Sequence, residues 1–189
     1  MLIRKLMLAT VLGLSFAVPA ALAPAYAQEK TVEVGGAPMY PSKDIIDNAV
    51  NSKDHTTLVA AVKAAGLVDT LKGAGPFTVF APVNAAFDAL PKGTVDTLLK
   101  PENKAMLTGI LTYHVVAGKM SAADLMAAIK AGGGKATLTT VQGGKLTAMM
   151  AGDKIELVDG KGGKSIVTIA DVNQKNGVIH VVDHVLLPM

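Results

Sequence analysis

The sequence predicts a single α+β domain in which a wedge or sandwich of β-strands is covered by several α-helices. The first half of the chain alternates capped, amphipathic helical segments with two short apolar strands. The second half contains five strand-like segments separated by turn formers, many of them glycine. Because strands and helices are largely segregated along the chain, a doubly wound parallel sheet is not expected.

The first 27 residues have the features of a secretory signal peptide. Arg4 and Lys5 precede an apolar run over 6–18, and Ala25–Ala27 fits the small-x-small cleavage pattern. Cleavage after Ala27 leaves 162 residues, enough for one domain with a sizeable core although cysteine is absent. No later apolar run approaches the ~20 residues of a membrane helix. We therefore expect a secreted or periplasmic protein with no integral membrane span after signal cleavage.

Residues 28–40 are polar and glycine-rich, so we expect a flexible leader followed by a folded domain over 41–189. The domain should open with a short helix for which Ser42 is the N-cap, because Ile45 and Ile46 then begin an apolar face.

Two more helices are expected before the first strand. Thr56 or Thr57 is suited to cap the longer one, and Gly66 suits the left-handed position that ends it. A shorter helix over 67–72 should stop at Gly73.

The middle of the chain interleaves strands with helices. Gly75–Pro82 and Thr112–Val116 are rich in β-branched and aromatic residues and are predicted to be strands. Between them, Asn84 and Thr94 are suited to cap two short helices, and Pro101 fits the first turn of a third.

Ser121, with Asp124 three residues later, begins a further helix that ends at the glycines of 132–134. The remainder is predicted to be a β-meander, because each apolar segment is followed by turn formers. Its strands are expected at 136–141, 145–150, 154–159, 165–172 and 178–187.

The composition after the signal peptide argues against nucleic-acid binding. This part of the chain has no arginine, and 16 lysines against 15 acidic residues leave it almost neutral. Nucleic-acid binding needs clustered cations and aromatic residues on which bases stack. Here the lysines are scattered and aromatic residues are few, so we expect no nucleic-acid partner.

His180, Asp183 and His184 near the C-terminus suggest a metal site at first sight. If 178–187 is a strand, however, the two histidines lie about 13 Å apart at ~3.3 Å per residue. One zinc ion needs both nitrogens at about 2.1 Å. Asp183 would point to the opposite face of the strand. We therefore predict no metal site.

Other catalytic patterns are also absent from the sequence. The GGKS segment, 162–165, precedes a strand, whereas a phosphate-binding loop must open a helix. None of the serines after the signal peptide lies in a GxSxG motif. Asp159 and His55 are expected to be solvated at turns or loops. We therefore predict no catalytic residue and no cofactor.

Tyr113 and His114 are the strongest candidate site residues. They lie within the apolar segment ILTYHVV, so their polar atoms should be buried and need hydrogen-bond partners. A structural role is favoured over that of a catalytic base.

Three separated segments resemble the hallmark motifs of the fasciclin domain family: Gly75–Phe87, Thr112–Val116 and Asn176–Pro188. The resemblance extends over 41–189, and the order and spacing of the segments agree with it. It implies a compact α+β domain found in exported adhesion and matrix proteins, with no catalytic machinery. It also implies that Tyr113 and His114 act in binding or hold the local structure.

The function predicted from this resemblance is that of an exported adhesion module. Its partner would be an extracellular protein or a polysaccharide of the matrix or envelope, because the chain lacks an Arg-Gly-Asp motif for animal receptors. The alternative is a carrier of an apolar small molecule such as a pigment or lipid, since flexible thioethers adapt to apolar ligands. The methionines that motivate this alternative are Met106, Met120, Met126, Met149 and Met150.

Overall fold

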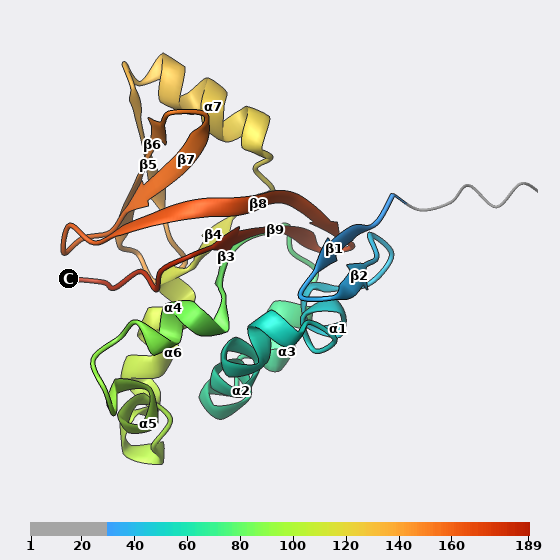
Figure 1. Ribbon diagram of the computed structural model, residues 1–189, viewed down its shortest axis with the longest axis vertical. Coiled ribbons are helices and arrows are strands. Elements are labelled where there is room, and N and C mark those ends of the chain that lie inside the picture. The colour runs from blue at the N-terminus through green and yellow to red at the C-terminus, as the bar shows by residue number, and fades with distance from the viewer. Residues whose placement is uncertain (1–29) are drawn as a thin grey trace, which may run out of the picture.

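The computed structural model describes residues 30–189, so the predicted signal peptide lies outside the described residues. A strongly bent sheet forms the middle of the molecule, most of the helices gather on one side of it, and one long helix lies on the other side (Figure 1). Within residues 30–189, no helix is long and apolar enough to cross a membrane. The mixed α+β class predicted from the sequence is confirmed.

The segment expected to be a flexible leader, 28–40, contains a β-hairpin in the structure. β1 (Val32–Val34) pairs antiparallel with β2 (Ala37–Met39). Gly35 and Gly36, with φ angles of 59° and 72°, form the two-residue turn. Both strands alternate, so Val34, Ala37 and Met39 are buried while Glu33 and Pro38 are exposed. The sequence analysis did not predict this alternation of buried and exposed residues, because the segment as a whole is polar and rich in glycine.

The first three helices pack beside this hairpin, and Gly66 ends the second of them in the left-handed conformation, as predicted. The cap of the first helix differs from the prediction. Asp44, not Ser42, is the N-cap, because its carboxylate accepts a hydrogen bond from the Asp47 backbone at 2.8 Å. The helices are α1 (Ile45–Ala49), α2 (Thr56–Ala65) and α3 (Val68–Lys72), with a 3-10 turn, η1 (Lys53–His55), before α2.

Asn84 caps a helix other than the one predicted. It belongs to the first turn of its own helix, which has no side-chain cap. Its amide oxygen instead accepts hydrogen bonds from the Thr57 backbone at 3.0 Å and the Thr56 hydroxyl at 3.1 Å. Asn84 therefore satisfies the start of α2, and its amide nitrogen holds the Lys53 carbonyl at 2.8 Å.

The middle of the chain follows the predicted order of elements, with one boundary displaced at its second strand. The capping box at Ser121 and Asp124 is confirmed, with both reciprocal hydrogen bonds present. The elements are β3 (Phe77–Pro82), α4 (Asn84–Asp88), α5 (Thr94–Leu98), η2 (Pro101–Asn103), α6 (Lys104–Tyr113), β4 (Val115–Ala117) and α7 (Ala122–Ala131).

The five strands of the second half complete a seven-stranded sheet of order β4-β3-β9-β8-β7-β6-β5. Neighbouring strands are antiparallel except β3 and β9, which are parallel. A bridge between Val116 and Thr140 brings the two ends of the sheet together, so the sheet is nearly closed. The new strands are β5 (Lys135–Thr139), β6 (Lys145–Ala151), β7 (Lys154–Val158), β8 (Lys164–Gln174) and β9 (Gly177–Val182).

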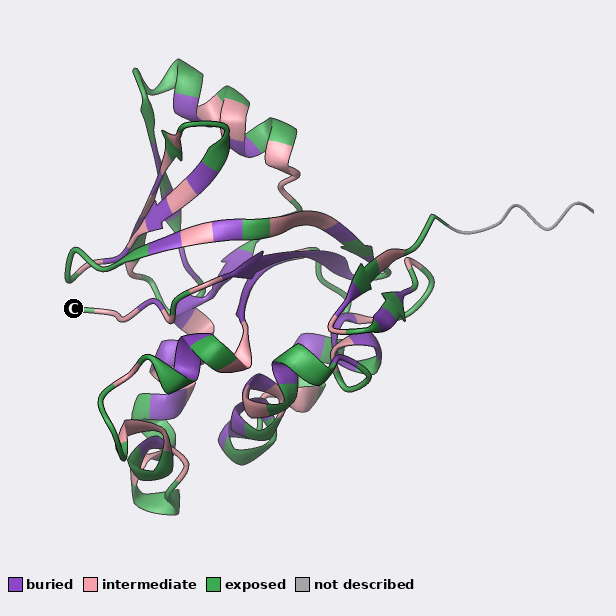
Figure 2. Cartoon of the chain, viewed as in Figure 1, coloured by how far each residue is buried: buried purple, intermediate pink, exposed green. Residues whose placement is uncertain are grey.

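Two apolar clusters fill the space on either side of the central strands. The hairpin and helices α1–α6 cover one face of β3 and β9, where Val79 and Ile179 are buried. The bent sheet folds over the other face, where α7 contributes Leu125 and Ile129. Figure 2 shows the consequence: β3 and β9 are buried along almost their whole length, whereas the outer strands are only partly buried.

Candidate functional site

Tyr113 and His114 lie at the end of a helix and not in a strand. Leu107, Ile110 and Leu111 are buried at helical spacing, and α6 continues through Tyr113 to a C-cap at His114. The predicted strand over Thr112–Val116 is therefore wrong in its first half, because the period of the preceding apolar residues extends into the Tyr-His pair. Only Val115 and Val116 enter β4.

The Tyr113 side chain is buried, and its hydroxyl is fully used by the protein. It donates a hydrogen bond to the Lys145 carbonyl at 2.6 Å and accepts one from the Gly160 N–H at 3.0 Å. Burial raises the pKa of Tyr113, with the nearby Asp159 acting in the same direction and the Gly160 N–H acting against it. The hydroxyl thus stays protonated and joins two loops.

The His114 ring bridges α6 to the C-terminal segment. Its Nε2 accepts a hydrogen bond from the Leu186 N–H at 3.0 Å, so the proton resides on Nδ1, which donates to the Ile110 carbonyl at 2.8 Å. That carbonyl is one of the last four of the helix, which have no partner within it. Burial lowers the pKa of His114 to about 4. The imidazole is therefore neutral and has no free nitrogen.

Asp159 also binds the C-terminal segment, and it links this segment to the turn after β7. Its Oδ1 accepts hydrogen bonds from the backbones of Lys161 at 2.9 Å and Gly163 at 2.7 Å, and its Oδ2 accepts one from Leu187 at 2.8 Å. The residue is buried, which corrects the expectation of a solvated turn carboxylate. The turn and the C-terminal segment are therefore held by one carboxylate.

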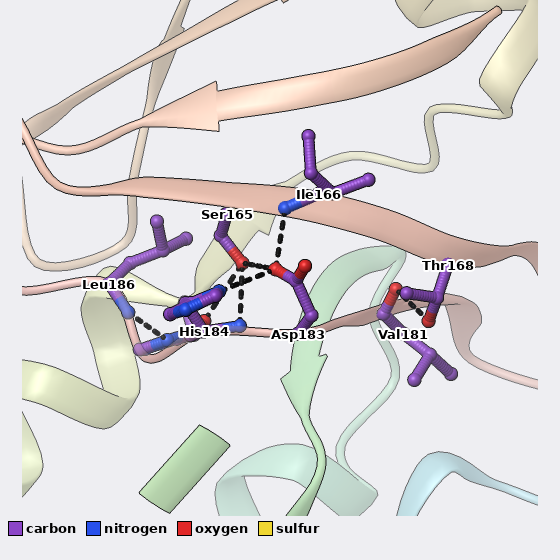
Figure 3. A network of polar contacts seen from close by, with 8 residues as sticks. Ser165, Ile166, Thr168, Val181, Asp183, His184 and Leu186 are labelled. Carbon is purple, nitrogen blue, oxygen red and sulfur yellow. Dashed lines mark hydrogen bonds and ion pairs between the residues drawn. The ribbon is translucent and has the colours of Figure 1, made fainter. Parts of the chain in front are cut away.

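A second polar cluster secures the chain just after β9, as Figure 3 shows. The Ser165 hydroxyl accepts a hydrogen bond from the His184 N–H at 3.0 Å and lies 2.9 Å from the His184 carbonyl. Asp183 Oδ1 accepts from the Ile166 N–H at 2.7 Å and lies 2.8 Å from His184 Nδ1. Burial acts to raise the pKa of Asp183, but these hydrogen bonds outweigh it and the pKa lies below its usual value.

This cluster contains serine, histidine and aspartate but lacks the arrangement of a serine hydrolase. Ser165 bonds to the backbone of His184 and not to its ring, so no nucleophile–base pair is formed. Ser165 is also fully buried. Ser165 therefore links β8 to the C-terminal segment through hydrogen bonds to the His184 backbone.

His180 and His184 occupy different environments. His180 lies in β9 as predicted, is fully buried, donates to the Met120 carbonyl at 2.9 Å and accepts from the Asp171 N–H at 3.3 Å. Its ring stacks on Phe80 with centroids 5.8 Å apart. The strand ends at Val182, so His184 lies outside it, whereas the sequence had predicted a strand that continues to residue 187. Among residues 30–189, no group of three potential ligands could hold a metal ion.

His55 was expected in a solvated loop but is buried where α2 begins. Its Nδ1 lies 2.9 Å from the Ser52 hydroxyl, and burial lowers its pKa. Nε2 is the one buried side-chain nitrogen or oxygen atom of the described residues without a hydrogen-bond partner. Only the non-local packing of α2 against the sheet explains this burial, and the sequence KDHTT gives no sign of it.

His55 lies beside an apolar cavity of about 40 Å³ between the hairpin, α2 and the sheet. Val34, Met39 and Ile179 are among its lining residues. For comparison, a dry apolar cavity that binds benzene has a volume of about 150 Å³. None of the five methionines that suggested a carrier lines this cavity, and Met106 is 60% exposed.

Comparison with known proteins assigns the family. The model of the Fasciclin domain matches residues 53–188. Protein sll1483 of Synechocystis sp. is 45% identical over 160 residues, which cover 85% of this chain and 82% of that protein. Cell surface glycolipoprotein MPB83 of Mycobacterium bovis is 34% identical over 168 residues, which cover 86% of this chain and 69% of that protein.

A solved structure has the same fold. The FAS1 domain pair from the insect cell adhesion molecule Fasciclin I superposes with a TM-score of 0.70 at 19% identity, covering 78% of this chain and 52% of that one. This chain thus spans about half of that two-domain structure. The resemblance seen in the three sequence segments is confirmed, and the chain belongs to the fasciclin domain family.

Proposed function

We propose that this chain is an exported adhesion module that binds an extracellular protein or a polysaccharide at the cell surface or in the envelope. The signal-like first 27 residues favour export. MPB83, a relative at 34% identity, is a cell surface glycolipoprotein, and Fasciclin I is an insect cell adhesion molecule.

One observation carries this proposal. The polar atoms of the buried Tyr113, His114 and His180 all bind backbone groups of the protein itself. These three buried groups fasten loops and do not face solvent, which favours a protein that acts through its outer surface. Catalysis is therefore not part of the proposed function.

Tyr113 and His114 contribute to binding indirectly in this proposal. Both are buried, so a partner cannot reach their polar atoms without local unfolding. They hold the start of β6, the turn at Gly160 and the C-terminal segment in place, and a partner would contact the surface that these segments form.

The test is a retention assay. The exported protein is displayed on beads and exposed to envelope polysaccharide and solubilised envelope protein, with an unrelated exported domain on control beads. We expect retention above the control. Glutamate substitutions at Met149 on the outer sheet and at Met106 on α6 then locate the contact surface. Equal retention on both kinds of bead would contradict the proposal.

The carrier of an apolar small molecule is a weaker alternative. The 40 Å³ cavity would have to expand several-fold to take a pigment or lipid. Purification of the native protein followed by organic extraction and an absorbance scan tests this alternative, and an extracted apolar compound at one equivalent would support it.

A further inference from the structure

Strands β5, β6 and β7 and the start of β8 present one side of the sheet to solvent. Buried and accessible residues alternate along β5, β7 and most of β6. The buried set, which includes Leu138 and Leu157, belongs to the apolar cluster that α7 completes. The accessible set therefore points away from the core. We call this accessible set, together with Lys164 and Ile166 of β8, the outer face.

The middle of the outer face is uncharged. Thr147 lies between Thr137 of β5 and Val158 of β7, and Met149 follows on the same side of β6. Within residues 30–189, the hydroxyls of Thr137 and Thr147 form no hydrogen bond. These hydroxyls are therefore free to bind a molecule that lies on the sheet.

Four lysines surround this middle, and three of them have no acidic partner. Lys135, Lys145 and Lys154 are exposed and form no ion pair within the described part of the chain. The fourth, Lys164, pairs with Glu156 at 3.0 Å. Glu156 is the one carboxylate of the outer face, so three positive charges remain without compensation.

The outer face concentrates positive charge on a chain that is almost neutral. Its four lysines and one carboxylate give a net charge of +3, whereas the rest of the chain after residue 27 has 12 lysines and 14 acidic residues. In the adjoining turns the exposed charges cancel, because Asp153 precedes β7 and Lys161 follows it. Charge complementarity therefore favours an anionic partner for this face.

The spacing of the lysines favours a polymer over a compact anion. The Cα atoms of Lys135 and Lys154 lie about 12 Å apart across the sheet, at ~4.8 Å between strands and ~3.3 Å per residue. Those of Lys135 and Lys145 are about 14 Å apart by the same geometry. Lysines spread in this way match several negative groups along one extended molecule.

The side chains of the outer face also select the kind of anionic polymer. The face has no aromatic residue on which a nucleotide base could stack, and no arginine fork for a phosphate. The free threonine hydroxyls can exchange hydrogen bonds with sugar hydroxyls, and Met149 and Val158 can contact the C–H groups of a sugar ring. Lysine is a point charge on a flexible stem, so it reaches carboxylates at varied positions.

We propose that the outer face binds an acidic polysaccharide, whose sugars carry carboxylates, through Lys135, Lys145 and Lys154. This inference rests on the proposed adhesion function and gives it a contact surface and a partner class. Exposed ion pairs each contribute little to binding, so one copy of the chain binds weakly. Firm attachment then requires many copies on one surface.

Titration of the exported protein with an oligomer of galacturonic acid, followed by amide NMR signals, tests the proposal. We expect the amides of Thr137, Thr147 and neighbouring outer-face residues to shift. Binding should weaken as salt is added, because exposed charges are screened beyond ~10 Å at about 0.1 M salt. In K135Q/K145Q/K154Q the dissociation constant should rise about tenfold, since each exposed ion pair is worth a factor of about two to three.

Matched controls separate the outer face from net charge. K63Q/K92Q/K100Q removes the same charge from three exposed lysines on or beside helices α2 and α5, and it should bind like the wild type. Circular dichroism should show both triple variants folded. The methyl ester of the same oligomer keeps the sugars but lacks the charges, and it should bind at least about tenfold more weakly. Equal weakening by the two triple variants, or equal binding of acid and ester, would overturn the proposal.

Competition distinguishes a sugar from other anions. Polyglutamate and vesicles of phosphatidylglycerol should displace the oligomer only at much higher concentrations of negative groups. Equal displacement by either would assign the face to an acidic protein or to a lipid surface and refute a polysaccharide. On the retention beads, wild type and K135Q/K145Q/K154Q that hold envelope material equally well would leave the adhesion function standing and this inference wrong.

Discussion

The Tyr113 hydroxyl connects the start of β6 to the turn after β7 through its hydrogen bonds to Lys145 and Gly160. We expect Tyr113→Phe to keep the ring packing but leave two backbone groups unpaired, which costs about 1–3 kcal/mol. Urea unfolding followed by circular dichroism measures the loss. Tyr40→Phe, on a ring that is 37% exposed, serves as the control and should change stability by less than about 0.5 kcal/mol.

The stability of the protein should depend on the Asp159 carboxylate as strongly as on the Tyr113 hydroxyl. Asparagine at this position replaces one of the two accepting oxygens with an NH₂ group that opposes a backbone N–H. We expect Asp159→Asn to destabilise the protein by about 1–3 kcal/mol and to speed hydrogen exchange at Gly163 and Leu187. Unchanged exchange at both amides would contradict this account, and Asp153→Asn in an exposed turn is the matched control.

Hydrogen bonds from buried side chains to distant backbone groups were the features least predictable from the sequence. Asp159 lies in a glycine-rich turn, where an aspartate usually faces solvent, and its partner Leu187 is far along the chain. His114 is different, since the apolar residues around it predicted burial and a need for hydrogen bonds. Local sequence can thus indicate that a polar group is buried, but not which distant backbone group satisfies it.

At the scale of elements, the contact of β3 with β9 leaves no room for an added atom at Gly177. A Cβ there would lie 2.1 Å from the Phe77 carbonyl oxygen. We expect Gly177→Ala to force the parallel pair apart and to cost at least about 1–3 kcal/mol, measured by thermal or urea unfolding.

The control for this prediction is Gly36→Ala, where an added Cβ meets nothing within 4 Å. Gly36 has a positive φ of 72°, so alanine there is strained but not in collision, and its cost should stay near 1 kcal/mol. A smaller loss at Gly177 than at Gly36 would refute the packing argument.

The β1–β2 hairpin is part of the core, although the family model begins only at residue 53. Met39 is 3% exposed and borders the apolar cavity, so Met39→Ala enlarges an existing void. We expect a loss of about 2–5 kcal/mol in the free energy of unfolding. Met106→Ala, on an exposed side chain, should be nearly neutral in the same urea titration.

Elements were predicted well where a local signal marks them. Gly66 and the capping box at Ser121 gave correct helix boundaries because these motifs act within one turn of the chain. The prediction of a strand over Thr112–Val116 was wrong in its first half, because β-branched residues follow directly on the apolar face of a helix. The packing of α6 decides where that helix ends. The hairpin was missed because its two strands are short and its buried residues alternate with polar ones.

On the scale of the whole molecule, buried neutral histidines make the fold sensitive to acid. Burial lowers the pKa values of His55, His114 and His180, and that of His114 falls to about 4. Between about pH 6.5 and 4, the unfolded state binds a proton at residue 114 that the folded state excludes. Stability therefore falls as the pH drops, by about 3 kcal/mol for His114 alone.

Urea unfolding at a series of pH values checks this prediction. The free energy of unfolding should decline from pH 7 to pH 4, and the decline should be shallower in His114→Asn, even though that variant is less stable at neutral pH. An identical slope in the wild type and the variant would show that His114 does not contribute.

The sequence segments that resembled the fasciclin domain family meet at the centre of the molecule. Gly75–Phe87 and Asn176–Pro188 contain β3 and β9, which lie side by side and are buried on both faces. Because both faces of these strands are buried, few side chains fit in them. This restriction explains why the two segments resemble the family motifs although they lie far apart in the chain. The outer strands face solvent on one side. Their sequences predicted strands but did not contribute to the family resemblance.

The position of β9 has a consequence for the order of events during biosynthesis. This strand lies between β3 and β8 in the middle of the sheet, yet it follows both of them in the chain and is synthesised after them. Until it arrives, β3 lacks its parallel neighbour, and neither apolar cluster can close. A nascent chain that stops short of β9 therefore has no complete core, however many of its other elements have been made.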